Sequence, residues 1–234
     1  MRLGWLLIFL LMAKSAAAAN FSVTPVRIYM KAQDRAVAVT IQNEGSGPVL
    51  LQADLYTWSQ KADGTDELVL TEDLILSPPI IKLGANAKQV VRLARLKPAD
   101  ASRQLTYRMV LREVPEATPQ KDNIQVAIAL ALSMPVFITP TPAQRHMACE
   151  GRRADAGTLD VSCLNKGSAY AQVREVTVRR GEEVLGRYEG GVYILPGARK
   201  VVPVKAGSSF PAGKLQVSVT YDDGRTEVFE MEAG

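Results

Sequence analysis

The sequence predicts an all-β protein built from two β-sandwich domains. Short apolar or alternating segments recur along the chain at regular spacing, and turns rich in Gly, Pro and Asn separate them. No segment carries the apolar period of a convincing helix. A Pro-rich break at residues 139–142, Thr-Pro-Thr-Pro, is typical of a stiff, extended linker. The strand pattern favours sandwiches, and the break favours two of them.

Residues 1–19 are predicted to form a cleaved export signal. Arg2 gives a positive start, residues 4–12 supply an apolar core, and Ala17 and Ala19 offer a small-residue cleavage site. The apolar run is too short to span a bilayer comfortably, and Lys14 interrupts it. We therefore expect the mature protein to be soluble and exported rather than anchored in a membrane.

The first domain is predicted to occupy residues 20–140. Its expected strands are residues 22–29, 36–42, 49–58, 74–76, 80–83, 88–93, 105–114 and 124–138. Residues 43–48, Asn-Glu-Gly-Ser-Gly-Pro, carry a strong turn signal. Pro78 and Pro79 exclude a central strand at their position, and Pro115 ends the strand before it.

The second domain is predicted to occupy residues 141–234, where the strand pattern restarts with shorter elements. Its expected strands are residues 159–164, 172–179, 192–195, 201–204, 215–221 and 228–231. Turns are expected at residues 165–167, at Gly181 and at residues 196–197, and residues 222–224, Asp-Asp-Gly, read as a hairpin turn. Tyr193 and Leu195 are expected in the core of this domain.

The most informative segment runs from Ile124 to Met134. Every even position in it is a large apolar residue, and every odd position is Gln, Ala or Ser. Successive side chains of a strand point to opposite faces, so this strand presents one bulky ridge and one nearly smooth face. Such a strand could serve the core of its own domain, or it could fill a groove in another protein.

The two cysteines, Cys149 and Cys163, are expected to form a disulfide, because an exported protein meets oxidising conditions. The bridge would close a loop of about 15 residues and contribute roughly 3 kcal/mol in the chain-entropy model. A redox or metal pair is the alternative. The spacing is not that of a CxxC pair, and the one histidine, His146, offers no third and fourth ligand.

An enzyme is not expected. A catalytic Ser-His-Asp or Cys-His arrangement would have to use His146, and the sequence contains no GxSxG, P-loop or HExxH motif. Asp222 and Asp223 lie in a turn, where a solvated loop is the simpler interpretation than a pair of catalytic carboxylates. Removal of the export signal lowers the formal net charge from +4 to about +2, and no basic run suggests a nucleic-acid partner.

Several short motifs, each weak alone, follow one another in a specific order. They are TPVRIY at residues 24–29, Asn43, SPP at 77–79, YRMVLREVP at 107–115, the alternating strand and its exit MPVFITP at 134–140, NKG at 165–167 and YILPG at 193–197. Together they resemble the periplasmic pilus-assembly chaperones of the chaperone–usher pathway, over nearly the whole mature chain. The resemblance implies two immunoglobulin-like sandwiches in a boomerang arrangement.

The resemblance also implies a function that needs neither nucleotide nor any other cofactor. Such chaperones bind one unfinished pilin subunit, insert their own strand into its open core by donor-strand complementation, and deliver it to an outer-membrane usher. On this basis the donor residues are Ile124, Val126, Ile128, Leu130 and Leu132. Burial of each large aliphatic side chain would contribute roughly 1.5–3 kcal/mol, partly offset by ordering costs.

A basic anchor for the C-terminal carboxylate of the subunit is implied as well. Conventional members use an Arg in the first strand, which Arg27 matches, and a Lys late in the donor strand, where this chain has Pro135. That departure, together with the Tyr107–Arg108 pair, resembles the archaic branch, whose subunits are spore-coat-U-like. In that branch Arg108 is the better anchor candidate, because a guanidinium can donate two parallel hydrogen bonds to a carboxylate.

Simpler roles stay open for the same residues. Leu132 and Met134 could belong to the core of their own domain. Arg27 could form an edge salt bridge, usually worth only about 0–1 kcal/mol, and Arg108 could be solvated. An exported β-sandwich adhesin or ligand-binding protein is the alternative function. The low aromatic content, 6%, counts against a sugar-binding surface.

Overall fold

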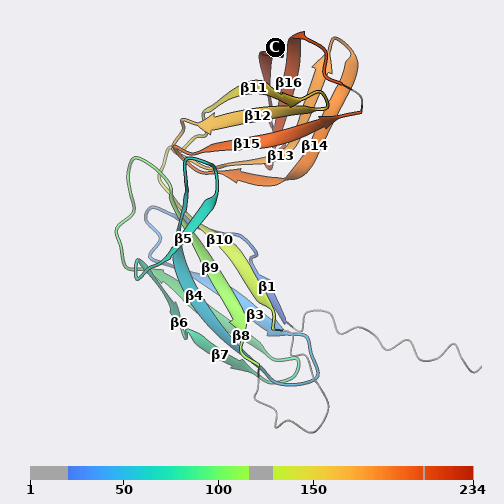
Figure 1. Ribbon diagram of the computed structural model, residues 1–234. Coiled ribbons are helices and arrows are strands. Elements are labelled where there is room, and N and C mark those ends of the chain that lie inside the picture. The colour runs from blue at the N-terminus through green and yellow to red at the C-terminus, as the bar shows by residue number, and fades with distance from the viewer. Residues whose placement is uncertain (1–20, 116–128, 208, 234) are drawn as a thin grey trace, which may run out of the picture.

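The computed structural model describes residues 21–115, 129–207 and 209–233, which form a bent molecule of two all-β parts (Figure 1). Strands β1 to β10 form the first part, and strands β11 to β17 form the second. Within the described ranges, no helix is long and apolar enough to cross a membrane. The predicted all-β class is confirmed.

The first domain consists of two sheets that enclose one apolar core. Its strands are β1 (Phe21–Thr24), β2 (Ile28–Lys31), β3 (Ala36–Asn43), β4 (Val49–Gln60), β5 (Asp66–Leu70), β6 (Leu74–Ser77), β7 (Ile80–Leu83), β8 (Lys88–Arg95), β9 (Leu105–Glu113) and β10 (Ala131–Thr139). The smaller sheet has the order β1-β3-β8-β6. The larger sheet has the order β2-β10-β9-β4-β5, with β7 also paired to β4.

The predicted strand at residues 22–29 is wrong, because the chain changes sheets in the middle of it. β1 pairs antiparallel with β3 in the smaller sheet, whereas β2 pairs parallel with β10 in the larger one. Pro25 has no backbone N–H to contribute to a ladder, and the strand ends before it. Arg27 therefore lies at the crossing between the two sheets, directly before β2.

Two strands, β5 and β11, were not predicted, and a third, β14, was predicted only at its C-terminal end. β5 was not predicted because its five residues do not alternate, and all of them are exposed at the edge of the sheet. β11 (Met147–Asp155) is mostly polar, and β14 (Glu183–Ile194) contains several glycines, so neither carries a strand pattern over its full length. Pairing with neighbouring strands, rather than apolar patterning, defines these elements.

β10 covers the C-terminal half of the alternating segment. Met134, Val136 and Ile138 are buried in the core of the first domain, and Leu130 and Leu132 pack against that core while remaining half-buried. Ile124, Val126 and Ile128 lie outside the described residues. The C-terminal end of the bulky ridge thus lies in the domain's own core. Of the two roles considered for Met134, the structure supports a place in that core.

The second domain is one continuous seven-stranded sheet that folds back on itself, so that β11 contacts β17. Besides β11 and β14, its strands are β12 (Thr158–Asn165), β13 (Ala171–Arg180), β15 (Arg199–Ala206), β16 (Gly213–Tyr221) and β17 (Thr226–Ala233). Gly181 and Gly224 have positive φ angles of 56° and 79° in the turns of two hairpins, a conformation that glycine adopts without steric cost. Cys149 and Cys163 lie opposite each other on β11 and β12 and form a disulfide.

A fully buried asparagine closes the loop that follows β3. Asn43 is 0% exposed, and its side-chain amide donates hydrogen bonds to the carbonyl oxygens of Gly47 and Gly84 at 2.8 and 2.7 Å. Its Oδ1 accepts a hydrogen bond from the N–H of Gly45 at 2.9 Å. The side chain satisfies backbone groups that would otherwise have no partner.

The second domain repeats this arrangement after β12. Asn165 is also 0% exposed, and its amide donates to the carbonyl oxygens of Ala169 and Ile194 at 2.8 and 3.0 Å. Its Oδ1 accepts from the N–H of Gly167 at 3.0 Å. In both domains the asparagine thus forms hydrogen bonds with the residues two and four positions further along the chain. The turns predicted after Asn43 and at residues 165–167 are the loops that these bonds close.

Candidate functional site

The two domains meet at a cluster of aromatic and charged side chains, which we call the interdomain site. The first domain contributes Arg27, Tyr29, Trp58, Arg108 and Phe137, and the second contributes Tyr170, Tyr193 and Asp222. Most of these residues lie near strand ends or directly beside a strand. The fold brings together positions as distant as Arg27 and Asp222, which are 195 residues apart.

Stacked aromatic rings form the centre of the interdomain site. Phe137 and Tyr170 stack across the domain boundary, with ring centroids 4.1 Å apart and planes inclined by 11°. Tyr29 stacks on the first domain's side of Phe137 at 5.7 Å, and Trp58 meets Tyr193 edge to face at 5.2 Å. Such pairs contribute about 0.5–1.5 kcal/mol each beyond the area they bury, so the stack favours one relative orientation of the domains.

Arg27 is paired within the protein. Its guanidinium forms an ion pair with Asp222 at 2.5 Å and lies 3.3 Å from the hydroxyl oxygens of Tyr29 and Tyr170, to which it donates. Burial lowers the pKa of Arg27, but the two tyrosine hydrogen bonds outweigh it and hold the pKa above its ordinary value. Arg27 is therefore a permanent cation, and it already has an anionic partner that joins the two domains.

Arg108, in contrast to Arg27, has no anionic partner among the described residues. Its guanidinium carbon lies 3.7 Å from the centroid of the Trp58 ring and 5.5 Å from that of Tyr193. Among the residues that the structure describes, no carboxylate or hydrogen-bond acceptor pairs with it. Burial lowers the pKa of Arg108, opposed by the charges of Asp66 and Tyr193. Arg108 is a half-buried cation, held over an aromatic face, whose N–H donors are available to an added anion.

Both sequence-predicted anchor residues therefore reach the interdomain site, but only Arg108 is available to a ligand there. Pro135 lies directly opposite Arg108 in the pairing of β10 with β9. Conventional family members were expected to carry a lysine at the position of Pro135 on β10. In this chain the available cation, Arg108, lies on the neighbouring strand β9.

One edge of β10 lacks a strand partner over part of its length. β9 pairs with residues 131–138 of β10, whereas β2 pairs only with residues 136–139 on the other side. In the described part of the first domain, no strand pairs with that second edge at residues 131–135. Unpaired backbone groups along a strand edge are a template for pairing with another chain.

Two glutamines connect the domains through backbone hydrogen bonds. The side chain of Gln60, at the end of β4, donates to the carbonyl oxygen of Tyr193 at 2.9 Å and accepts from the N–H of Leu195 at 3.0 Å. The side chain of Gln104 accepts from the N–H of Tyr170 at 2.9 Å. Together with the aromatic stack, these bonds position Tyr193 and Tyr170 next to the first domain.

Several members of this site were not predicted from the sequence. Asp222 was assigned to a solvated turn, which is wrong, because its side chain is largely buried against Arg27. Tyr193 was assigned to the core of the second domain, but it is only partly buried there and contacts Trp58 and Arg108 instead. Leu195 is buried in that core as predicted. Nothing local in the sequence distinguishes Asp222 from its neighbour in the same turn.

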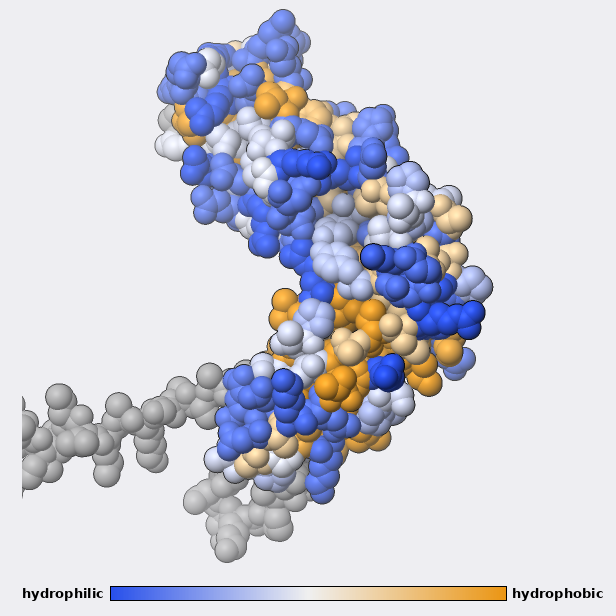
Figure 2. All heavy atoms as spheres, turned by 180° about the vertical axis from the view of Figure 1, so that it is seen from behind, coloured by the Kyte–Doolittle hydropathy of each residue, from blue (hydrophilic) through white to orange (hydrophobic). Residues whose placement is uncertain are grey.

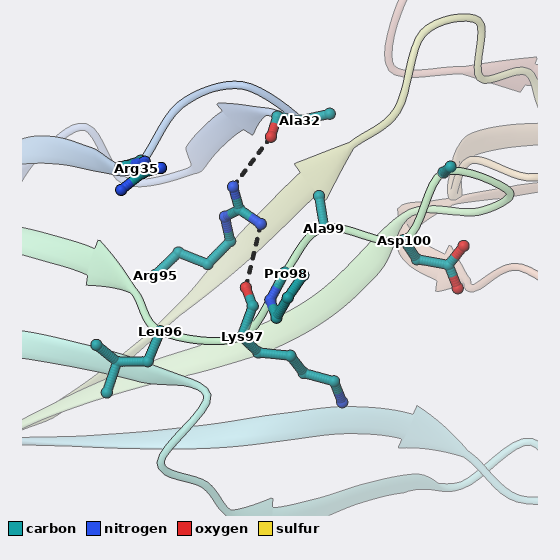
Figure 3. Close-up of a pocket in the computed structure, with 9 residues that line it drawn as sticks. Ala32, Arg35, Arg95, Leu96, Lys97, Pro98, Ala99 and Asp100 are labelled. Atoms are coloured by element: carbon teal, nitrogen blue, oxygen red, sulfur yellow. Dashed lines mark hydrogen bonds between the residues drawn. The ribbon is translucent and has the colours of Figure 1, made fainter.

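A separate hollow of about 510 Å³ lies where the loop after β8 faces the turn after β2 (Figure 3). Its most prominent basic residue, Arg95, donates to the carbonyl oxygens of Ala32 and Lys97 at 3.0 and 3.1 Å. Lys97 in turn forms an ion pair with Asp73 at 3.3 Å. The hydrogen bonds of Arg95 thus join the loop after β8 to the turn after β2. The third basic residue that lines the hollow, Arg35, is exposed to solvent.

No group of His, Cys, Asp and Glu side chains in the described ranges could hold a metal ion. Exposed apolar residues, by contrast, are concentrated on the first domain. They are Val26, Tyr29, Leu68, Val69, Leu70, Ile75, Ile80, Val90, Leu96 and Val114, against Val184, Val201 and Val228 on the second. Figure 2 shows the same contrast, with apolar residues gathered on the first domain near the bend and a mostly hydrophilic second domain.

The molecule thus consists of two β-sandwich domains joined at an aromatic and basic site. A family model described as pili and flagellar-assembly chaperone, PapD N-terminal domain, matches residues 20–144. The chain belongs to this family, and the predicted pilus-assembly chaperone identity is confirmed. No curated protein sequence matches the chain significantly.

Solved structures with the same fold cover nearly the whole chain. One is the CsuC–CsuE chaperone–tip adhesion subunit pre-assembly complex from archaic chaperone-usher Csu pili of Acinetobacter baumannii, with a TM-score of 0.68, 20% identity, and coverage of 92% of this chain and 100% of the matched chain. The Pseudomonas aeruginosa CupB2 chaperone has a TM-score of 0.59 and 18% identity, covering 91% and 100%. The Salmonella enterica SafA pilin–SafB chaperone complex has a TM-score of 0.59 and 16% identity, covering 92% and 97%. These likenesses confirm the two immunoglobulin-like sandwiches.

Proposed function

We propose that this protein is a periplasmic chaperone that binds a pilin subunit by donor-strand complementation and delivers it to an outer-membrane usher. Membership of the pilus chaperone family supports the class. The single observation that carries the mechanism is the open edge of β10 at residues 131–135, next to a ridge of alternating apolar side chains. An open edge beside apolar side chains is what a subunit lacking a strand requires.

The position of the ridge suggests how the donor strand is divided. Met134 is buried in the first domain, while Leu132 and Leu130 are only half-buried at the margin of its core. Residues 124–128 continue the same alternation in the sequence. The strand would therefore serve the chaperone's own core at its C-terminal end and the subunit's core at its N-terminal end. Ile124, Val126, Ile128, Leu130 and Leu132 are the proposed donor side chains.

Arg108 is proposed as the anchor for the C-terminal carboxylate of the subunit. Arg108 is already partly removed from water in the free protein, so binding a carboxylate costs little further desolvation of this cation. The ion pair should therefore contribute strongly to the affinity for the subunit. The guanidinium can donate two hydrogen bonds to the carboxylate. Arg27 would act through the ion pair with Asp222, which holds the second domain in place beside the anchor.

The archaic branch fits this arrangement best, and with it a spore-coat-U-like subunit. The chain has Pro135 where conventional members were expected to carry lysine, and the structure of a complex from archaic Csu pili is among those most similar to it. Export to the periplasm rests on the signal-like residues 1–19, and the Cys149–Cys163 disulfide suits that oxidising compartment.

Capture of the tagged protein from its own periplasm tests the proposal. We expect the wild type to co-purify with a small β-rich subunit, and an Ile128→Asp/Leu130→Asp variant to lose it, because two buried carboxylates would enter the subunit's core. A Gln125→Asp variant, altered at a polar odd-numbered position of the alternating sequence, should retain the subunit. All three proteins are first compared by circular dichroism and thermal unfolding.

Each alternative result has a distinct meaning. Equal capture by the wild type and the double variant would assign the ridge to the protein's own core and place the partner elsewhere. Capture by neither would contradict the proposed binding of a subunit by donor-strand complementation.

A further inference from the structure

An exposed apolar strip lies on the same face of the larger sheet of the first domain as Arg108. Leu68 and Leu70 of β5 form this strip, and their exposed fractions are 42% and 68%. β5 was not predicted from the sequence, and the two leucines have no part in the donor strand or the anchor. Two exposed leucines on one face of an edge strand lie outside the core and are accessible to a partner.

The strand register places the strip on the same face as the proposed anchor. Leu70 is paired with Tyr56, and Tyr56 is paired with Arg108, so the three side chains lie in one row across β5, β4 and β9. Leu68 is paired with Trp58 in the next row. Directly paired residues of an antiparallel sheet project to the same face.

A second observation links Arg108 to β5. Its guanidinium lies over the ring of Trp58, the residue paired with Leu68, and the charge of Asp66, the first residue of β5, opposes the lowering of its pKa by burial. Adjacent strands are about 4.8 Å apart, so β5 and β9, with β4 between them, are separated by about 10 Å. If a terminal carboxylate bound the guanidinium of Arg108, the side chain of the same residue could extend across β4 toward Leu68 and Leu70.

We propose that the Leu68–Leu70 strip receives the side chain of the last residue of the bound subunit and selects for an apolar residue at that position. This inference rests on the proposed function, because it requires the terminal carboxylate to bind Arg108. The occupant is therefore a free chain terminus with a large aliphatic or aromatic last side chain.

Peptide titrations test the strip separately from the anchor. The protein from residue 20 onward contains Trp58 as its only tryptophan, so its fluorescence reports on the site beneath Arg108. The probes are three short synthetic peptides of otherwise identical sequence, ending in a leucine acid, a serine acid and a leucine amide. We expect the leucine acid to bind about tenfold more tightly than the serine acid, and the amide to bind more weakly than either.

Two variants of β5 separate the possible outcomes. Leu68→Ser/Leu70→Ser should reduce the preference for leucine over serine to less than about twofold while keeping the preference for acid over amide. The control is Val69→Ser, because Val69 is 56% exposed but lies on the opposite face of the strand; it should keep both preferences. Circular dichroism verifies that both variants fold.

The proposed role of Leu68 and Leu70 would be contradicted if the preference for leucine survived in the double variant or were lost equally in the Val69 control. Neither result would contradict the role of Arg108 as the carboxylate anchor. Equal binding of the acid and the amide would overturn the Arg108 anchor and, with it, the inference that depends on it. Absence of binding by every peptide at millimolar concentration would overturn both.

Discussion

Replacing Arg108 with alanine should weaken subunit binding on the order of 100-fold while leaving both domains folded. The expected loss is that of truncating one partner of a largely desolvated charge pair. The free protein should change little in stability, because Arg108 has no ion pair among the described residues, and removing a half-buried cation offsets the loss of its contact with Trp58. The measurement is the dissociation constant of the captured complex, with thermal unfolding of the free chaperone in parallel.

Arg112 provides a matched control on the same strand and face. Its guanidinium forms an ion pair with Asp54 and donates to the hydroxyl of Tyr56, so it has no free donor role to lose on subunit binding. Arg112→Ala should leave affinity within a few-fold of the wild type. Arg108→Lys should retain part of the affinity, since it keeps the charge but not the two-donor geometry. Normal binding by Arg108→Ala, with loss in Arg27→Ala, would reverse the assignment of the two arginines.

Replacing Asn165 with alanine should destabilise the second domain by about 3 kcal/mol. The substitution leaves the carbonyl oxygens of Ala169 and Ile194 and the N–H of Gly167 without their partner, and each buried unsatisfied group costs about 1–3 kcal/mol unless water reaches it. Asn43→Ala should have a similar effect on the first domain for the same reason. These are the largest stability effects that we expect from a single side chain.

Urea unfolding followed by circular dichroism measures both effects. The exposed neighbour of Asn165, Lys166, supplies the control, and Lys166→Ala should change the free energy of unfolding by no more than about 0.5 kcal/mol. Equal stability of Asn165→Ala and Lys166→Ala would show that water or a local rearrangement satisfies the exposed backbone groups. The account of the two equivalent asparagines would then be wrong.

Much of the fold was predictable because its strands bury one face. Segments such as β3 and β12 alternate in burial and alternate in sequence, so their positions follow from period-two patterning. β5 and β11 owe their existence to pairing with a neighbour, and their own side chains remain largely exposed. The switch of the chain between sheets after Thr24 was marked by Pro25, but the proline did not indicate that the two halves belong to different sheets.

The interdomain site was predictable only in part. Arg27 and Arg108 were identified through the resemblance to a family. The sequence did not show that Arg27 is ion-paired and Arg108 is not, because that difference depends on residues of the other domain. Asp222 neutralises Arg27 from 195 positions away, and neither partner carries a local signal of this contact. The same holds for Gln60, a single polar residue whose role is apparent only when it bonds the backbone at Tyr193. Tertiary juxtaposition, rather than pattern, defines these residues.

Hydrogen exchange of the captured complex, compared with the free chaperone, tests donor-strand complementation most directly. The backbone amides on the open edge of β10, between Ala131 and Met134, should exchange rapidly in the free protein and become protected by on the order of 100-fold when a subunit strand pairs with them. Amides that already bond β9 should change far less. Unchanged exchange along this edge, with new protection confined to another strand such as β1 or β5, would contradict the assignment of β10 as the donor strand.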